Sequence, residues 1–454
     1  MSKPDHHDMR KSTGLSPLFG LVLAACTSNA PPPASVAPAP PVAAPAPVNG
    51  PGKVLAYWMQ LGPFGGRIVR AVMSGNECPW LSAAQARVLF DTRAEATGEF
   101  PLVCSTVVPK GTDDVEIETT NTPAQHLPLP KFASDPQRIL VIGDTGCRLK
   151  GSLVQPCNDE RQWPFADIAR KAAALKPDLV IHVGDYLYRE NACPANDAGC
   201  QGTPFGDNWP TWAADFFTPA QPLLATVPWV FVRGNHEDCQ RAGLGWTRLL
   251  GHAHFVPTSP CPDHTPPYSV PLAAMTLVVM DNANAPDTAV DASMVPTYRE
   301  ELESLGTVQA PVWALMHRPI WAAVSGPLGV PVGGNATMIE AAGKDGIPQN
   351  VTLLLAGHIH TFEAINYKDK VPPQILAGGG GDLLDKTPLD LAGTIFQGSS
   401  GVSVKDGLSI NGFSYLLMTK AADGWGIDVF NQHGVAVRHC TFAGRRVDCP
   451  APTR

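Results

Sequence analysis

The chain has 454 residues, of which 44% are hydrophobic and 16% are charged, so it is long and apolar enough to bury a substantial core. Its formal net charge is −8 and its isoelectric point is about 5.9, and no basic stripe runs through the sequence. This charge balance excludes a protein that binds nucleic acid mainly by neutralising phosphates, so we expect no nucleic acid partner.

Residues 1–25 are typical of an export signal. Three basic residues, the last of them Lys11, precede an apolar stretch at residues 15–25 that is too short to cross a bilayer. The stretch ends in Leu-Ala-Ala followed by Cys26, which resembles a bacterial lipoprotein processing site. That resemblance implies a lipid anchor on Cys26 and a membrane-attached protein in the periplasm or at the cell surface. An ordinary signal peptide, cleaved at small residues, is the alternative.

Two regions of different composition follow. Residues 26–52 are rich in proline and alanine, which predicts an extended linker without a core of its own. Residues 53–133 contain short alternating stretches, for example at 53–58 and 114–118, and we expect a small, mostly β region here. The Leu-Pro-Leu-Pro segment at 127–130 is interpreted as a linker.

Five polar clusters organise residues 134–454. Each follows or ends a run of apolar residues that reads as a buried strand, so the clusters belong on loops at strand ends. Such loops converge on one crevice in α/β sheets. The predicted strands are 138–142, 179–183, 229–233, 312–315 and 351–356. The clusters are Gly143-Asp144-Thr145-Gly146, Gly184-Asp185-Tyr186-Leu187-Tyr188, Gly234-Asn235-His236-Glu237, Ala314-Leu315-Met316-His317 and Gly357-His358-Ile359-His360.

Helical and hairpin patterns fill the remaining chain. Helices are predicted at 165–175 and 298–305, with a broken helix at 209–224. Strand–helix alternation favours an α/β layered fold. Later segments predict hairpin strands at 363–367, 371–376, 415–420, 426–430 and 435–440. The glycine run at 378–381 is interpreted as a flexible loop near the site, and it lacks the Lys-Ser/Thr ending of a P-loop.

In their order, the five clusters resemble the motifs of the metallophosphoesterase (calcineurin-like) superfamily, and closest its purple acid phosphatases. That family reads D-x-G, G-D-x-x-Y, G-N-H-E/D, V-x-x-H and G-H-x-H, and the one departure is Ala314 at the valine position. The resemblance implies an α/β fold, a four-layer sandwich of two mixed β-sheets flanked by helices. This domain would span residues 134–454, with the small β region at 53–133 as an N-terminal extension.

The resemblance also implies a binuclear metal site. One metal would be held by Asp144, Tyr188, His360 and a bridging Asp185. The other would be held by Asp185, Asn235, His317 and His358.

Tyr188 and Gly146 distinguish this site from most of the superfamily. Gly146 stands where other members carry a histidine ligand, and Tyr188 is placed to replace it. A phenolate is a hard ligand, which favours Fe(III) at the first position with a divalent iron, zinc or manganese ion at the second. Tyr186 has the wrong offset and is interpreted as a packing residue.

The implied activity is hydrolysis of phosphomonoesters by a metal-activated hydroxide in an exported enzyme. His236 would protonate the leaving group or hold the phosphoryl oxygens. A phosphodiesterase of the same superfamily and a non-catalytic, lipid-anchored binding protein are the alternatives. Five further side chains could contact the substrate or serve only as surface or paired residues: Arg189, Arg318, Glu237, His252 and His254.

The cysteines agree with export. The chain has 11 cysteines, and ten remain when Cys26 is set aside. They occur at short separations, so the simplest pairing joins sequence neighbours, although other connectivities stay possible. That pairing is 78–104, 147–157, 193–200, 239–261 and 440–449.

The lipid anchor can be tested directly. Mass spectrometry of membrane-fraction protein should find a diacylated Cys26 at the N-terminus, because the processing site places this cysteine first in the mature chain. Cys26→Ser should abolish the lipid and release the protein from membranes. A mature protein that starts elsewhere and carries no lipid would contradict the assignment.

Overall fold

A computed structural model describes residues 49–50, 52–83, 86–121, 123–309, 311–326, 331–343, 346–368, 370–396 and 401–451. They all belong to one compact unit, residues 40–454. The predicted signal peptide, Cys26 and nearly all of the predicted linker lie outside the described residues. Within those residues no helix has the length and apolar character needed to cross a membrane.

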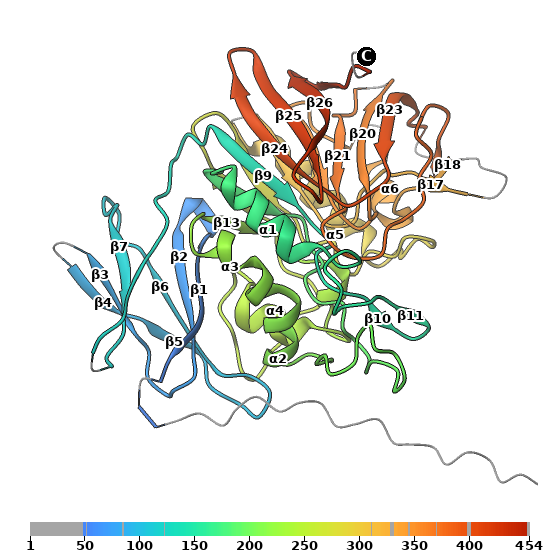
Figure 1. The fold of residues 1–454 in the computed structure, drawn as a ribbon. Coiled ribbons are helices and arrows are strands. Elements are labelled where there is room, and N and C mark those ends of the chain that lie inside the picture. Colours follow the sequence, from blue (N-terminus) through green and yellow to red (C-terminus); the bar gives the residue numbers. More distant parts are fainter. Residues whose placement is uncertain are drawn as a thin grey trace, which may run out of the picture. The chain divides into compact units, whose positions relative to one another are not determined.

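Two large mixed sheets form the centre of the fold (Figure 1). The 11-stranded sheet has the order β27 (Arg446–Asp448), β26 (Ala436–Ala443), β25 (Gly424–Asn431), β24 (Ser414–Ala421), β9 (Arg138–Ile142), β12 (Leu179–His182), β13 (Trp229–Phe231), β1 (Val54–Leu61), β2 (Arg67–Met73), β6 (Leu102–Val107) and β5 (Asp91–Ala94). The 7-stranded sheet has the order β14 (Tyr268–Pro271), β15 (Thr276–Val279), β16 (Val312–Leu315), β19 (Val351–Ala356), β21 (Gln374–Ala377), β20 (Phe362–Tyr367) and β23 (Val404–Ile410).

The middle of each sheet is parallel. β9, β12 and β13 run parallel in the first sheet, and β15, β16, β19 and β21 run parallel in the second. Every residue of β12, β16 and β21 is buried, which explains why these segments read as continuous apolar runs rather than alternating ones. The carboxyl ends of the parallel strands therefore carry the loops with the polar clusters.

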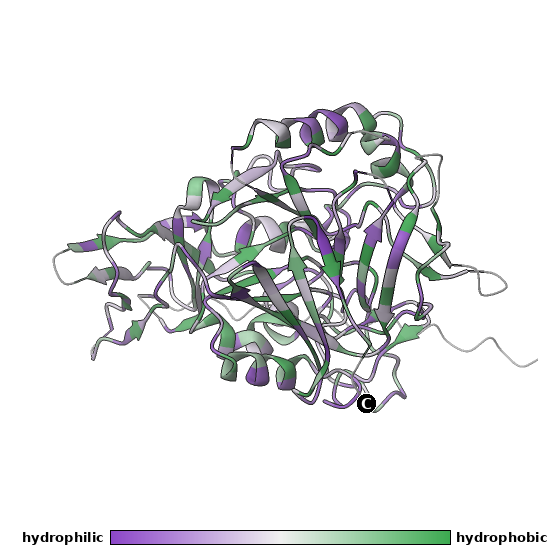
Figure 2. Ribbon diagram, turned by 90° about the horizontal axis from the view of Figure 1, so that it is seen from above, coloured by the Kyte–Doolittle hydropathy of each residue, from purple (hydrophilic) through white to green (hydrophobic). Residues whose placement is uncertain are grey.

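Helices cover the outer faces of the two sheets, giving the expected four layers. The helices are α1 (Phe165–Ala174), α2 (Trp209–Trp212), α3 (Thr218–Leu224), α4 (Gly243–Leu249), α5 (Val295–Ser304) and α6 (Ala336–Ala342). One core packs α1 and α3 on the first sheet, a second fills the space between the sheets, and a third packs α5 and α6 on the second sheet. Figure 2 shows helices on both outer sides, with polar and apolar residues alternating along them. The predicted fold class is confirmed.

Residues 53–133 are mostly β, as expected. Four of its strands, β1, β2, β6 and β5, extend the 11-stranded sheet, which they join through a parallel pairing of β1 with β13. The other four form a separate sheet of β4 (Ala86–Leu89), β3 (Trp80–Ala83), β7 (Val115–Glu118) and β8 (His126–Pro128). The domain boundary at residue 134 stays a prediction.

Short elements complete the chain. Two small sheets are formed by β10 (Leu149–Lys150) with β11 (Leu153–Val154), and by β17 (Val324–Ser325), β18 (Pro331–Gly333) and β22 (Ile395–Phe396). Single helical turns are η1 (Pro63–Gly65), η3 (Asn235–Glu237) and η4 (Leu305–Thr307), and a π-helical turn, η2 (Ala213–Phe217), joins α2 to α3. This π-helical junction is the break predicted within 209–224.

Three local predictions were wrong in detail. The supposed linker at 127–130 contains most of β8, an edge strand in which Pro128 is tolerated because one side of the strand needs no donor. β21 begins at Gln374 rather than at residue 371, since the two prolines before it cannot donate to the sheet. The glycine run at 378–381 is fully buried rather than flexible, and a Cβ on Gly380 would lie 2.2 Å from the Gly143 carbonyl oxygen. Its glycines permit close packing against the first cluster.

All five predicted disulfides are present: Cys78–Cys104, Cys147–Cys157, Cys193–Cys200, Cys239–Cys261 and Cys440–Cys449. Five disulfides are typical of a protein that folds in an oxidising compartment outside the cytosol.

Candidate metal centre

The five clusters meet where the carboxyl ends of the two sheets face each other. β9 and β12 of the first sheet lead into Asp144 and Asp185, and β13 leads into Asn235. In the second sheet β16 ends just before His317, and β19 ends just before the His358-x-His360 pair. Seven side chains predicted as ligands are thereby brought together from both sheets.

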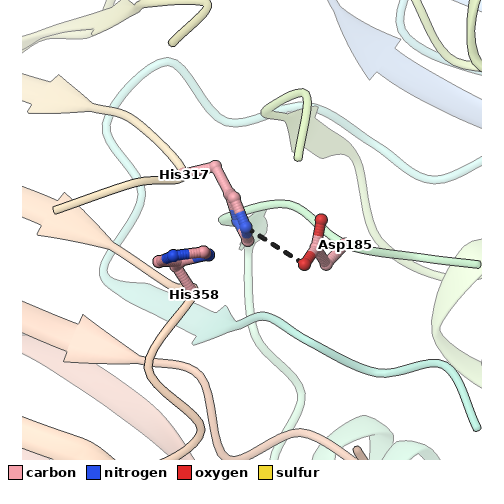
Figure 3. Close-up of side chains that lie close together, drawn as sticks. All are labelled: Asp185, His317 and His358. Atoms are coloured by element: carbon pink, nitrogen blue, oxygen red, sulfur yellow. Dashed lines mark ion pairs between the residues drawn. The ribbon is translucent and has the colours of Figure 1, made fainter. Parts of the chain in front are cut away.

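Asp185 lies at the centre of this group. Its Oδ2 atom is 3.1 Å from His317 Nε2, and His317 Nε2 is also 3.1 Å from Asn235 Oδ1. One ligand atom from each of Asp185, His317 and His358 lies within 4.8 Å of the others. Figure 3 shows the two imidazoles and the carboxylate facing a common space. The carbonyl of Val183 accepts from His317 Nδ1 at 2.8 Å, which leaves Nε2 free to face Asp185.

The hydroxyl group of Tyr188 lies close to three other predicted metal ligands. Its Oη atom lies 2.7 Å from Asp185 Oδ2, 3.0 Å from Asp144 Oδ1 and 3.1 Å from His360 Nε2. The Leu383 carbonyl, 2.6 Å from His360 Nδ1, fixes the opposite edge of that ring. The phenol oxygen therefore sits among two carboxylates and an imidazole.

Gly146 and Tyr188 depend on each other sterically. A Cβ atom on Gly146 would lie 2.9 Å from Tyr188 Cδ2 and 2.7 Å from the Tyr186 carbonyl oxygen. A histidine at residue 146 could not fit beside this tyrosine without moving the backbone. Tyr186 itself is buried in an aromatic cluster and donates to the Val232 carbonyl at 2.9 Å, so it packs as expected.

The backbone is strained at three of these side chains. Asp144, Asp185 and His358 have φ angles of 57°, 60° and 72° in the left-handed region. Such conformations cost on the order of 1–3 kcal/mol each in residues with a Cβ and cluster at functional sites. The neighbouring Gly234 lets the backbone approach, because a Cβ there would lie 2.1 Å from Asp185 Oδ1.

The two buried aspartates lack a cationic side-chain partner. Among the described residues, the ion pairs of Asp144 and Asp185 are formed with histidines and with no lysine or arginine. Burial lowers the pKa of His317, but Asp185 and Asp144 outweigh it and raise that pKa to about 9. Burial, Asp144 and Asp185 raise the pKa of Tyr188 well above its usual value. This accumulation of buried negative charge fits bound cations, which would supply the missing positive charge.

Glu237 holds the second and third clusters together. One carboxylate oxygen accepts from the amides of Asp185 and Gly234, both at 3.1 Å, and the other accepts from Tyr186 at 2.8 Å and Leu187 at 3.1 Å. Burial and Asp185 raise the pKa of Glu237 to about 8, while the amide donors oppose that rise. Glu237 is fully buried and absent from the cleft wall, so it is a structural residue rather than a substrate contact.

His236 lies beside the group without joining it. Its Nε2 atom is 3.9 Å from Asp185 Oδ2, and its Nδ1 atom is 2.7 Å from Glu190 Oε1. Arg241 bridges the same Glu190 and approaches His236 Nε2 at 2.8 Å. Burial lowers the pKa of His236 to about 3, which favours a neutral ring.

A cleft of about 620 Å³ opens above these side chains, and its wall includes Asp185, Asn235, His236, His358 and His360. Arg318, one of the side chains left open by the sequence, lines it and pairs with Asp287, whose Oδ2 is 3.0 Å from His358 Nε2. The others lie elsewhere. Arg189 is buried with its Nε 2.6 Å from Asp215, and His252 and His254 border a separate pocket.

Residues 137–362 match the family model described as calcineurin-like phosphoesterase. The chain belongs to the calcineurin-like phosphoesterase family. This membership makes the chain a metal-dependent phosphoester hydrolase.

Two solved structures share the fold. A purple acid phosphatase isolated from yellow lupin (Lupinus luteus) seeds aligns with a TM-score of 0.57 at 12% identity, covering 87% of this chain and 75% of the other. A structure described as PhoD aligns with a TM-score of 0.52 at 12% identity, covering 90% of this chain and 94% of the other. No curated protein sequence matches the chain.

Sequence reasoning missed several residues of this site. Glu190, Arg241, Asp287 and Asp382 all contact predicted site residues, and Arg148 lies over the Tyr188 ring at 4.7 Å while pairing with Asp382. Arg148, Glu190 and Arg241 lie shortly after a cluster in sequence. Asp287 and Asp382 come from loops without a recurring spacing, so no pattern pointed to them.

Glu237→Gln should destabilise the protein although it preserves side-chain shape. The amide nitrogen of glutamine cannot accept, so two buried backbone N–H groups would lose their partners at about 1–3 kcal/mol each. We expect a lower melting temperature and a lower content of bound metal. Glu340→Gln, on the exposed side of α6, should change neither property. An unchanged melting temperature in Glu237→Gln would contradict the structural role.

Proposed function

We propose that this protein is an exported phosphoesterase that hydrolyses phosphomonoesters with two metal ions held by Asp144, Asp185, Tyr188, Asn235, His317, His358 and His360. The observation that carries the proposal is the convergence of two carboxylates and an imidazole within 3.1 Å of Tyr188 Oη, beside a second group around His317. Buried donors gather in this way where cations compensate their charge.

Each metal has its own set of donors in this proposal. Asp144, Tyr188 and His360 hold the first ion, and Asn235, His317 and His358 hold the second. Asp185 is shared, and its central position between Tyr188 and His317 supports that role. When bound, the two cations would make water more acidic and polarise the phosphoryl oxygens.

The phenol of Tyr188 favours Fe(III) at the first position, with a divalent iron, zinc or manganese ion at the second. The steric dependence of Tyr188 on Gly146 supports this assignment, because it leaves no space for a histidine ligand at residue 146. Arg148 over the ring face would further favour an anionic phenolate.

His236 would act on the leaving group. It lines the cleft and lies next to Asp185, and Glu190 fixes its Nδ1 edge so that Nε2 faces the centre. Burial favours the neutral ring, whereas a phosphate dianion close by would favour the protonated one. A proton at Nε2 for the departing alkoxide would require bound substrate to displace Arg241, whose Nη2 donor lies 2.8 Å from that nitrogen.

Phosphodiesters are the alternative substrates of the same site, and a non-catalytic binding protein is disfavoured by family membership. Purified protein, analysed for metals, should release phosphate from an aryl phosphate faster than it cleaves the matching bis-aryl diester. The reverse order would make the protein a diesterase. Export and membrane attachment through Cys26 are part of the proposal and are supported by the five disulfides.

Tyr188→Phe tests the first ligand set, because it keeps the ring and removes only the oxygen. Oxidised wild-type protein should show a visible charge-transfer band, and the variant should lose the band and bind iron more weakly. Tyr186→Phe is the matched control, since its hydroxyl bonds the Val232 carbonyl instead. A colourless wild type with two zinc or manganese ions, and a Tyr188→Phe variant of nearly full activity, would refute the assignment.

His236→Ala should keep both metals and lose roughly 10²–10⁴-fold in rate, most of all with poor leaving groups. Steady-state kinetics with aryl phosphates of increasing leaving-group pKa, together with metal analysis, measure both effects. His252→Ala provides the control, because this half-buried ring packs on Tyr268 outside the cleft. Loss of metal in proportion to activity would show that His236 is structural instead.

A further inference from the structure

Three kinds of side chain line the cleft. Besides the motif residues, six charged residues contribute to the wall: Arg148, Lys150, Arg241, Asp287, Arg318 and Asp385. Four residues outside the motifs contribute aliphatic side chains: Leu153, Val324, Leu383 and Leu384. We call these four residues the aliphatic rim. None of them belongs to the proposed metal ligands or to the proposed proton donor.

The rim comes from three segments that hydrogen bonds attach to the site. The β10–β11 hairpin carries Leu153 and is fixed by the bond from Leu149 N to the Tyr188 carbonyl at 3.0 Å. The Leu383 carbonyl holds His360 Nδ1 at 2.6 Å. Val324 lies beside the loop of Leu384, because Ser325 N donates to the Lys386 carbonyl at 2.9 Å.

An ion pair joins the first two segments. Arg148, which directly precedes β10, forms a bidentate contact with Asp382, the residue before Leu383. The position of the rim relative to the centre is therefore set by the same bonds that orient Tyr188 and His360.

Two rim residues expose apolar surface that a ligand could cover. Leu153 is 51% exposed and Leu384 is 38% exposed. Covering apolar area gains about 25 cal/mol per Å², so an alkyl group laid on them would bind more tightly than a polar one. No phenylalanine, tyrosine or tryptophan lines the cleft in the described part of the chain, so a base or aromatic ring has no stacking partner there.

We propose that the substrates are phosphate esters of aliphatic alcohols, with the alkyl chain on the aliphatic rim and the phosphate at the metal centre. This inference deepens the proposed function and rests on it for the placement of the phosphate. It predicts that such esters bind more tightly than nucleotides, whose base would have no aromatic side chain to stack on in this cleft.

A chain-length series tests the proposal with the metal-loaded protein. Ethyl, butyl and hexyl phosphate have leaving groups of similar basicity, so a change in kcat/KM along the series reports contacts rather than chemistry. Wild-type kcat/KM should rise about two- to fourfold per methylene, the order expected for covering a CH₂ group, and at least about tenfold from ethyl to hexyl. Glycerol 1-phosphate should resemble the ethyl ester.

Substitutions in the aliphatic rim test whether these residues contact the alkyl chain. Leu153→Ser and Leu384→Ser should each lower the hexyl-to-ethyl ratio of kcat/KM by about three- to tenfold. Leu389→Ser is the matched control, because Leu389 is 69% exposed and lies outside the cleft wall. Equal turnover of ethyl and hexyl phosphate by wild type, or a ratio unchanged in both rim variants, would overturn the proposal.

A binding experiment with alkyl phosphonates can test the aliphatic rim independently of the proposed hydrolytic activity. Alkyl phosphonates have no ester bond to cleave, and calorimetry should show that their Kd falls with chain length in wild type but much less in Leu153→Ser. If this dependence appears while no ester is hydrolysed, the rim assignment holds and the proposed activity fails. If phosphonates bind without any dependence on length, the rim assignment is wrong even when esters are hydrolysed.

Discussion

Two buried carboxylates without a lysine or arginine partner constrain this whole structure. Asp144 and Asp185 end neighbouring parallel strands at the junction of the two sheets, where burial would penalise their charge severely. Histidines, a tyrosine and an asparagine surround them, and the carboxylates draw positive charge toward the group, as the raised pKa of His317 shows. Members of the calcineurin-like phosphoesterase family use metal ions, and this charge pattern explains why the fold is compatible with them.

The surrounding chain holds these groups in conformations that they would not adopt alone. Left-handed φ angles at Asp144, Asp185 and His358 are unfavourable for residues with a Cβ. Glu237 offsets part of this cost by accepting four backbone amides. The Cys147–Cys157 and Cys239–Cys261 disulfides restrain the loops next to two of the clusters. The strand ends, the Glu237 hydrogen bonds and the disulfides together hold the donor side chains in position. Metal binding and phosphoryl transfer require donors that are positioned in advance.

The outer part of the cleft contains none of the proposed metal ligands, and its shape is set by the conformations of the surrounding loops. Arg148 links the loops to the proposed metal ligands. It contacts the Tyr188 ring and also binds Asp382, the residue before Leu383 of the aliphatic rim. A change in this loop region would therefore alter both the surroundings of Tyr188 and the aliphatic rim. The second sheet contributes in a similar way through Arg318 and Asp287, which border His358.

The sequence by itself determined the strands and the five clusters, because each depends on residues close together in the chain. For the disulfides it indicated neighbour-to-neighbour pairing only as the simplest of several connectivities. Apolar runs such as 138–142 and 351–356 define buried strands locally, and their ends place Asp144 and His358 on loops. The fold class and the family followed from the order of the clusters. Element boundaries failed where prolines decide hydrogen bonding, as at the start of β21 and in β8.

Only the tertiary structure decided which loops meet across the two sheets. Glu190 reaches His236 from the loop of the second cluster, and Asp382 reaches His360 from the loop that follows β21. The pairing of β1 with β13 likewise joins segments far apart in the chain. Loop conformations and the order of strands in a sheet depend on contacts between residues far apart in the chain. A hydrophobic periodicity in the sequence reports the environment of one segment only, so it does not predict these contacts. The neighbours that shape this cleft were therefore absent from any local motif.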